Sequence, residues 1–156
     1  MTKILFICHG NICRSPMAEY VLRDLADRAG LAAQVRVASA ATSREEIGNP
    51  VYPPVRRLLA RHGIRVDAHA ARQLTRADYD AYDHLIGMDA ANLANMRRLF
   101  GHDEKLSLLM DYTPTPRDVA DPWYTGDFDA TWRDVATACR ALLQSLFPEI
   151  EVPEIP

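Results

Sequence analysis

A thiol and a guanidinium lie close together near the start of the chain, in the segment Cys8–Ser15, which reads CHGNICRS. A cysteine thiolate is a nucleophile, and the planar fork of an arginine holds two phosphate oxygens at once. The backbone N–H groups of a tight loop that runs from a strand into a helix point inward and bind anions. The spacing therefore predicts a phosphate-binding loop around a nucleophilic Cys8, with Arg14 as the clamp on the phosphate.

The other residues of this loop fit the same interpretation. Gly10 and Asn11 are the types best able to take the positive φ that such a curl needs, so we expect both to do so. Ser15 is placed to donate a hydrogen bond to the sulfur when it becomes the leaving group. The positive surroundings favour the thiolate form of Cys8. A lone cysteine would be read as a buried strand residue before an ordinary turn, but the cysteine, five residues and Arg-Ser together favour function. The remaining members of the predicted loop are His9, Ile12 and Cys13.

Apolar patterns along the chain predict strands that alternate with helices. Strands are expected at residues 3–8, 34–38, 83–88 and 105–110, and helices at 16–29, 55–62, 90–100 and 128–147. Ser15 fits the N-cap of the first helix and Gly30 its end. Such alternation favours an α/β fold with a parallel sheet covered on both faces, and ligands of such sheets bind beyond the carboxyl ends of the strands. We expect one domain over residues 1–156, in which residues 148–156 form a short Pro-rich tail without regular structure.

Composition narrows the class of protein. The chain has 156 residues, 48% of them hydrophobic, and a formal net charge of −3, which is typical of a globular domain and unlike a nucleic-acid-binding surface. No run approaches the ~20 apolar residues of a membrane helix. Three cysteines are an odd and low number that argues against a disulfide framework. We therefore expect a cytoplasmic protein with no nucleic-acid or membrane partner.

The chain resembles the low-molecular-weight protein tyrosine phosphatases along essentially its whole length, most specifically in ILFICHGNICRSPMAE at residues 4–19. Shorter matching segments follow in order: SAAT at 39–42, IGNP at 47–50, HGI at 62–64, HAARQLT at 69–75, MDAANL at 88–93 and DPWY at 121–124. The resemblance implies a three-layer α/β fold whose four-stranded parallel sheet has helices on both faces. It also implies a cysteine-dependent phosphatase that hydrolyses phosphotyrosine in proteins through a phosphocysteine intermediate and releases inorganic phosphate. We expect it to act as a monomer, with no cofactor and no metal.

The resemblance assigns roles to individual residues. Cys8 is the nucleophile, Arg14 the phosphate clamp and Asp121 the general acid, supplied from a separate loop. The chemistry itself calls for such an acid, because a phenolate with a conjugate-acid pKa of ~10 is a poor leaving group. Asn11, Ser15, Ser39 and His69 resemble the family's hydrogen-bonded group that holds the phosphate-binding loop in shape. The role implied for Asp89 is to orient the arginine of the loop.

Four further residues bear on substrate. Trp123 and Tyr124 are expected to form a wall against which a substrate ring stacks. Ile12 stands where phosphoarginine phosphatases of this fold carry a threonine, which favours phosphotyrosine. Glu45 stands near the position of an aromatic residue common in the family, so we predict a cleft that prefers basic residues beside the phosphotyrosine.

The two cysteines of the loop suggest a redox property as well. The resemblance implies that Cys13 forms a reversible disulfide with Cys8 under peroxide and so protects the nucleophile from further oxidation. His9 departs from the apolar residue common after the nucleophile, and we expect it to be exposed and without a special role. Cys139, on the last predicted helix, is expected to be a packed core thiol.

Other functions of a Cys-containing phosphate loop stay open at this point. An arsenate reductase on this fold would need a pair of redox cysteines after Asp78, where only Cys139 is found. A phosphoarginine phosphatase, a phosphocysteine carrier and a phosphate-binding module without catalysis are the remaining alternatives. A carrier or a binding module would have no need of both Arg14 and Asp121.

Overall fold

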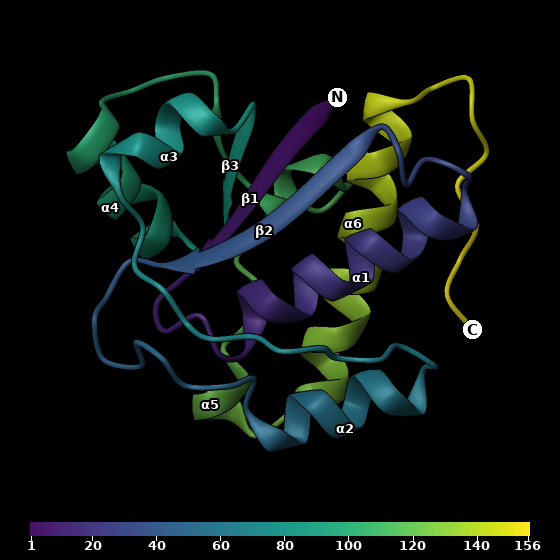
Figure 1. Ribbon diagram of the computed structural model, residues 1–156, viewed down its shortest axis with the longest axis horizontal. Helices are drawn as coiled ribbons and strands as arrows, with labels where there is room; N and C mark the ends of the chain where they lie inside the picture. The colour runs from purple at the N-terminus through teal and green to yellow at the C-terminus, as the bar shows by residue number, and fades with distance from the viewer.

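One parallel four-stranded sheet forms the centre of the computed structural model, which describes residues 1–156 (Figure 1). Its strands, in the spatial order β2-β1-β3-β4, are β1 Thr2–Cys8, β2 Val35–Ala41, β3 His84–Gly87 and β4 Leu106–Leu108. The helices are α1 Arg14–Arg28, α2 Pro53–Arg61, α3 Arg76–Ala81, α4 Ala90–Phe100, α5 Pro122–Thr125 and α6 Phe128–Leu146, with a 3-10 turn, η1, at Leu109–Tyr112. The predicted α/β class with a parallel sheet is confirmed.

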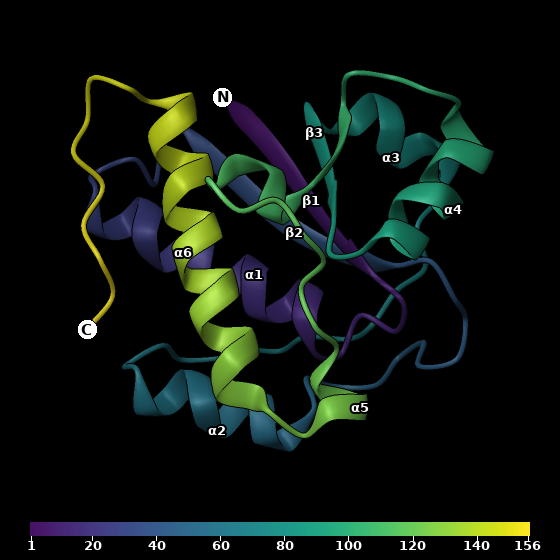
Figure 2. The ribbon, with the colours of Figure 1, turned by 180° about the vertical axis from the view of Figure 1, so that it is seen from behind.

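The central strand β1 packs against helices on both of its faces. Ile4 and Phe6 point into the larger of two apolar clusters, which includes side chains of α1, α2 and α6. Leu5 and Ile7 point into a smaller cluster that includes Met96 of α4. Alternating residues of one strand thus enter opposite cores, as expected of a strand buried on both faces. Figures 1 and 2 show the layers, with α1 and α6 together on one side of the sheet and α3 and α4 on the other.

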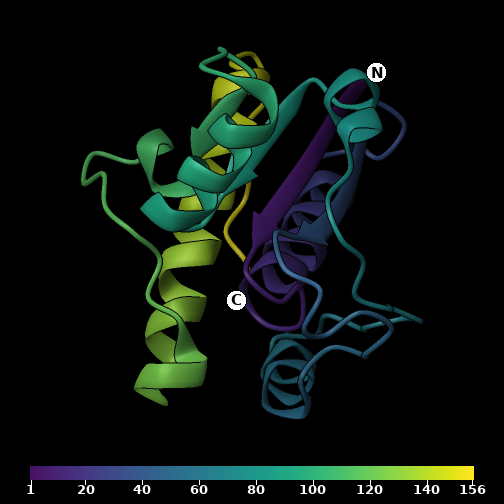
Figure 3. The ribbon, with the colours of Figure 1, turned by 90° about the vertical axis from the view of Figure 1, so that its left-hand side faces the viewer.

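The carboxyl ends of the strands meet at one edge of the sheet, and the loop after Cys8 lies there. Cys8 is paired with Ala41 at the end of β2, and Ile7 with Gly87 at the end of β3. The chain runs from β1 to β2 in one direction along the sheet and to β3 in the other, and ligands bind at such a reversal. Figure 3 shows β1 ending in the loop that leads to α1.

Helix α1 begins earlier than predicted. It starts at Arg14 with Cys13 at its N-cap, whereas the sequence predicted Ser15 there. The hydroxyl of Ser15 is engaged by Cys8 and Asn11, so it does not cap the helix. The loop therefore continues directly into the first helical turn.

The last predicted strand is shorter than expected, and two short helices were not predicted. The segment expected as a strand over 105–110 ends at Leu108, where the Asp111 carboxylate accepts the Leu108 N–H at 3.2 Å and the 3-10 turn begins. The helices α3 and α5 contain six and four residues. Both are set by capping side chains, Asp78 in α3 and Asp121 before α5, and such short segments carry no apolar periodicity.

The tail after α6 has no helix or strand, as predicted, yet it is packed against the molecule. Val152 is fully buried. Arg140 donates to the Val152 carbonyl at 2.9 Å, and Gln144 donates to the Ile150 carbonyl at 2.6 Å. Figure 2 shows this segment running along the outside of α6. None of the helices combines the length and the apolar character needed to cross a lipid bilayer.

Candidate active site

The thiol of Cys8 lies at the bottom of the loop and faces hydrogen-bond donors. Its Sγ lies 3.0 Å from Ser15 Oγ and accepts the backbone N–H of Asn11 at 3.3 Å. The residue is 3% exposed, so it is almost completely shielded from bulk water. The sulfur is therefore held by two groups that can each donate a hydrogen bond to it.

The curl of the loop depends on Asn11. It has φ of 60° and is the only residue other than glycine with positive φ. His69 Nε2 donates to its carbonyl at 2.9 Å, and the N–H of Arg72 donates to its side-chain Oδ1 at 3.3 Å. The expectation of positive φ holds for Asn11 and is wrong for Gly10. A Cβ added at Gly10 would lie 3.3 Å from Cγ of Glu46, a tight contact that the Glu46 side chain would have to relieve by a small shift.

A chain of buried hydrogen bonds fixes the loop from behind. The side-chain amide of Asn11 donates to Ser15 Oγ and to Ser39 Oγ, both at 2.8 Å. Ser39 in turn donates to Glu19 at 2.6 Å, and Glu19 accepts from Arg23 at 2.6 Å. Because Ser15 Oγ accepts from the amide, its own hydrogen is free for the sulfur. Glu19 was not among the predicted residues, because its burial to 7% exposure and its bond to Ser39 appear only in the structure.

Arg14 is buried and held between acidic and carbonyl oxygens. Its Nη1 donates to Asp89 at 2.8 Å and to the carbonyl of Val119 at 2.9 Å, and its Nη2 lies 3.4 Å from Asp121 Oδ2. Burial alone would lower the pKa of Arg14, but the neighbouring Cys8, Asp89 and Asp121 raise that pKa above its ordinary value. The guanidinium is therefore always charged, and its plane is fixed.

Asp121 is the N-cap of α5, at the end of the loop that follows η1. Its Oδ1 accepts the N–H of Trp123 at 3.0 Å. The loop is anchored just before it, because the Val119 N–H donates to Met88 at 2.8 Å and Thr131 Oγ1 donates to Ala120 at 3.0 Å. These bonds place the Asp121 carboxylate beside Arg14.

An aromatic contact, which sequence reasoning missed, supports the loop that carries Asp121, the predicted acid; we call this segment the acid loop. The ring of Trp123 lies 4.9 Å from that of Tyr52, and Tyr52 stacks on Phe128 at 6.1 Å. The backbone N–H of Tyr52 donates to the Ile12 carbonyl at 2.9 Å. Tyr52 thus joins the acid loop to the phosphate-binding loop. In the sequence, the only sign of this role is that Tyr52 follows a Pro-containing segment.

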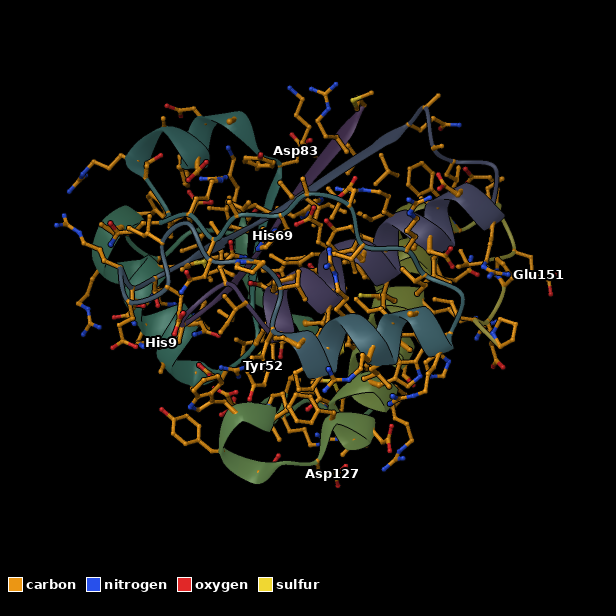
Figure 4. The ribbon with its side chains drawn as sticks, turned by 60° about the horizontal axis from the view of Figure 1, so that its bottom comes forward. His9, Tyr52, His69, Asp83, Asp127 and Glu151 are labelled. Carbon is orange, nitrogen blue, oxygen red and sulfur yellow. The ribbon has the colours of Figure 1, made fainter.

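These elements enclose a hollow of about 120 Å³. It is lined by Cys8, His9, Gly10, Asn11, Ile12, Cys13, Arg14, Glu45, Glu46, Asp121, Trp123 and Tyr124. The structure therefore brings the predicted nucleophile, clamp, acid and cleft residues to one place. Ser39, His69 and Asp89 contact the loop residues without lining the hollow. Figure 4 looks toward this end of the molecule, with His9, Tyr52 and His69 labelled.

His9 is exposed, as expected, but it is not without contacts. Its Nε2 lies 2.9 Å from Glu45 Oε2, and both side chains are more than half exposed. This pair forms part of the rim of the hollow, opposite the exposed side chains of Trp123 and Tyr124.

The other two thiols differ from Cys8 in their surroundings. Burial raises the pKa of Cys13 to about 12, and the negative charges of Cys8 and Asp121 add to this effect. Cys13 is therefore protonated at neutral pH, although it lies in the same loop. Cys139 is fully buried, which raises its pKa strongly, and the prediction of a packed core thiol is confirmed. All three cysteines are free.

Comparison with known proteins agrees with this geometry. The family described as "Low molecular weight phosphotyrosine protein phosphatase" matches residues 3–151. The chain is 40% identical to low molecular weight protein-tyrosine-phosphatase YfkJ of Bacillus subtilis, over 96% of this chain and 98% of that protein. It is 38% identical to the low molecular weight phosphotyrosine protein phosphatase of Homo sapiens, over 91% and 94%.

Solved structures give the same result. The crystal structure of YfkJ superposes with a TM-score of 0.92 over 96% of each chain, at 40% identity. A Drosophila arginine phosphatase superposes with a TM-score of 0.86 over 94% of this chain and 98% of that one, at 28% identity. The match over nearly the whole length, together with the Cys8 loop, shows that the chain belongs to the low molecular weight phosphotyrosine protein phosphatase family.

Proposed function

We propose that the protein hydrolyses phosphotyrosine in phosphoproteins by way of a phosphocysteine intermediate on Cys8. The observation that carries the proposal is that Cys8, Arg14 and Asp121 line one hollow. A nucleophile, an anion clamp and a proton donor are the groups that hydrolysis of a phosphomonoester needs.

In the first step the thiolate of Cys8 attacks phosphorus in line with the leaving oxygen. The S–P bond forms as the P–O bond to the tyrosine breaks, and Asp121, in its carboxylic acid form, gives a proton to that oxygen. Arg14 and the backbone N–H groups of the loop hold the other phosphoryl oxygens, where charge develops. In-line attack places the leaving oxygen on the side of phosphorus opposite the sulfur. The proton donor must reach that side, and Asp121 is supplied by a loop separate from that of Cys8.

In the second step water attacks the phosphocysteine. Asp121, now a carboxylate, takes a proton from the water, and the S–P bond breaks to release inorganic phosphate. The leaving group is the Cys8 thiolate, which receives the Ser15 hydrogen bond across 3.0 Å. The same carboxyl group therefore acts as acid in one step and as base in the next.

Phosphotyrosine is favoured over phosphoarginine by the walls of the hollow. The apolar Ile12 lines its floor, and the exposed Trp123 and Tyr124 line its rim, which suits a phenyl ring. Phosphoarginine is the second candidate, because an arginine phosphatase is among the structural neighbours. Comparing kcat/KM for the two phosphoamino acids in peptides tests the choice, and an Ile12→Thr variant is expected to shift the ratio toward phosphoarginine.

The acidic rim predicts a preference for basic residues on one side of the phosphotyrosine. Glu45 is 69% exposed, and Glu46 lines the hollow beside it. A peptide scan that places lysine at each flanking position is expected to find a position where lysine raises kcat/KM and where Glu45→Gln removes the gain. Equal kcat/KM with and without lysine at every flanking position would contradict this prediction.

We also propose that Cys13 takes part in a protective redox switch. Peroxide oxidises the Cys8 thiolate to a sulfenic acid, and the Cys13 thiol displaces water from it to form a disulfide that an added thiol reduces. Cys13 lines the same hollow as Cys8. If a Cys13→Ser variant recovers from peroxide and thiol as fully as the wild type, the switch is not formed.

We also propose a cellular location, an oligomeric state and a domain organisation. A cytoplasmic location is supported by the free thiols of all three cysteines, since that compartment keeps thiols reduced. We propose a monomer with a single phosphatase domain over residues 1–156.

Turnover of p-nitrophenyl phosphate tests the proposed reaction. We expect hydrolysis that persists in excess EDTA, is inhibited by vanadate and is lost in Cys8→Ser. A wild-type protein that binds phosphate but turns over no ester would favour a carrier or a binding module. Reduction of arsenate by the wild-type protein would favour the reductase.

A further inference from the structure

A second hollow lies next to the active site and shares one residue with it. It measures about 480 Å³ and is open to solvent. His9 lines both hollows, so the imidazole marks the border between them. We call this second hollow the basic groove, and its lining residues are His9, Thr42, Ser43, Gln73, Leu74, Arg76, Asn95, Arg98 and Leu99.

The basic groove begins at the backbone of the nucleophile loop. The N–H of Thr42 donates to the Cys8 carbonyl at 3.0 Å, and the N–H of Ser43 donates to the His9 carbonyl at 3.1 Å. The segment after β2 therefore runs alongside the loop, and α3 and α4 supply the other walls. Figure 4 shows His9 at the side of the loop nearest α4.

The charge of the groove is opposite to that of the rim beside it. None of its lining residues is acidic, and Arg76 and Arg98 bring two guanidinium groups to it. Neither arginine forms a salt bridge, whereas seven of the chain's eight salt bridges engage other arginines. Arg44 does not line the groove but donates to the side chain of Gln73, which does, at 3.1 Å. In a chain with a net charge of −3, this is a local site for an anion.

The neutral residues of the groove suit the same ligand. Thr42 and Ser43 offer hydroxyl groups that can donate hydrogen bonds to oxygen. Asn95 accepts from Arg98 through its Oδ1, which leaves its side-chain N–H groups to donate, whereas Gln73 is already bonded to Arg44 and to the Thr42 carbonyl. By contrast, the active-site hollow carries Glu45 and Glu46 on its rim. A polypeptide that crosses His9 thus passes from an acidic rim to a basic groove.

We propose that the basic groove binds an aspartate or glutamate side chain of the substrate polypeptide, close in sequence to the phosphotyrosine. This inference rests on the proposed function. An extended chain advances ~3.3 Å per residue, so a residue two or three positions away lies ~7–10 Å along the backbone. His9 lines both hollows, so the groove adjoins the hollow in which a phosphotyrosine on Cys8 would sit.

The expected selectivity is modest, because the two arginines are exposed. Each exposed ion pair corresponds to about a 1.4- to 5-fold change in an equilibrium or in kcat/KM. We expect glutamate at the correct position to raise kcat/KM about three- to tenfold over glutamine, and the gain to fall as salt is added.

The experiment compares phosphotyrosine peptides that carry glutamate or glutamine at each of the four positions on either side. Three enzymes are used: the wild type, the double variant Arg76→Gln/Arg98→Gln, and Arg97→Gln as the matched control. Arg97 is exposed on α4 next to Arg98 but does not line the groove. We expect one position at which glutamate is preferred by the wild type and by Arg97→Gln, and a loss of that preference in the double variant. Turnover of p-nitrophenyl phosphate, which has no flanking residues, is expected to be equal in all three.

Each other outcome has a distinct meaning. If no position shows a preference for glutamate in the wild type, or if the double variant keeps the preference, the groove does not bind a carboxylate. If Arg97→Gln loses the preference to the same extent, the preference comes from the overall positive charge near α4 and not from binding in the groove. If a second phosphotyrosine is preferred where glutamate is not, the groove binds phosphate and the carboxylate assignment is wrong. If the wild type cleaves p-nitrophenyl phosphate but no phosphotyrosine peptide, the proposed function fails rather than the groove.

Discussion

The direction of the hydrogen bonds around Cys8 explains how one sulfur serves as both nucleophile and leaving group. The amide of Asn11 can only donate through its nitrogen, so Ser15 Oγ is the acceptor of that bond at 2.8 Å. The Ser15 hydrogen is then directed to the sulfur. A donor that is fixed before the reaction stabilises the thiolate in both steps without having to move.

Replacing Asp121 tests the acid role at the level of one residue. We expect Asp121→Asn to lower kcat/KM for phenyl phosphate by about 10²–10⁴-fold, because the phenolate leaves without a proton. The loss is expected to shrink as ring substituents make the phenol more acidic, and this dependence is measured with a series of aryl phosphates. Asp118→Asn, three residues earlier in the same loop, is the control and should behave like the wild type. A loss in Asp121→Asn that is the same for every leaving group would contradict the acid role.

At the scale of elements, the loop keeps its shape through contacts from several parts of the chain. His69 and Arg72 hold Asn11 from the segment before α3, while Ser39 reaches it from β2. The side chain of Arg72 pairs with Asp78 of α3 at 3.0 Å and 3.1 Å. The geometry of the hollow therefore depends on residues that line no part of it.

Two substitutions of Asn11 separate its backbone role from its side-chain role. Glycine adopts positive φ freely, whereas alanine loses about 1–2 kcal/mol there, so Asn11→Ala is expected to be less stable than Asn11→Gly by that amount. Both variants lose the bonds to Ser15 and Ser39, so kcat is expected to fall in both. Urea unfolding and p-nitrophenyl phosphate kinetics measure the two effects. Equal stability of the two variants would contradict the backbone role.

The Arg72–Asp78 pair predicts a dependence of stability on pH. Burial alone would raise the pKa of Asp78, but the hydrogen bonds from Arg72 and Thr75 outweigh it and hold that pKa below its ordinary value. The contribution is therefore complete above the unfolded pKa of ~3.9 and is lost as pH falls through the lower folded value. We expect Asp78→Asn to lower the free energy of unfolding by about 1–2 kcal/mol at pH 7, through the lost cap and ion pair.

This difference between wild type and Asp78→Asn should shrink below about pH 4, as measured by urea unfolding at each pH. Asp80→Asn is the matched control, because Asp80 is exposed on the same helix. A constant difference from pH 7 to pH 3 would show that the carboxylate charge contributes nothing.

At the scale of the whole molecule, the parts that the sequence predicted are those set by local patterns. The apolar run before Cys8, the helical spacing after Ser15 and the loop between them were visible in neighbouring residues. Glu19 and Tyr52 were not identified, because their partners Ser39 and Trp123 lie far away in the sequence. The early start of α1 was also missed, since it depends on Ser15 being engaged by Cys8 rather than by the helix.

The packing of the tail against α6 was also not predicted from the sequence, and it gives a testable prediction for the whole fold. Deleting residues 148–156 removes the buried Val152, and burial of one valine contributes about 1.5–3 kcal/mol. We expect the deletion to lower the free energy of unfolding by at least that amount, measured in urea. Kinetics with p-nitrophenyl phosphate are expected to be unchanged, because the tail lies along α6, away from the hollow (Figure 2).

The matched control for the deletion is Glu154→Gln. It breaks only an exposed ion pair with Arg140 at 3.8 Å and should change stability by about 0–1 kcal/mol. A deletion that is no more harmful than this substitution would show that the tail does not contribute to the core.

The central claim is that the phosphoryl group passes through Cys8. Mixing the wild-type protein with p-nitrophenyl phosphate, denaturing it within milliseconds and analysing its peptides by mass spectrometry tests the claim directly. We expect one phosphoryl group on the peptide that contains Cys8, formed before phosphate is released and absent in Cys8→Ser. Release of phosphate with no such adduct, or a phosphoryl group on any other residue, would contradict it.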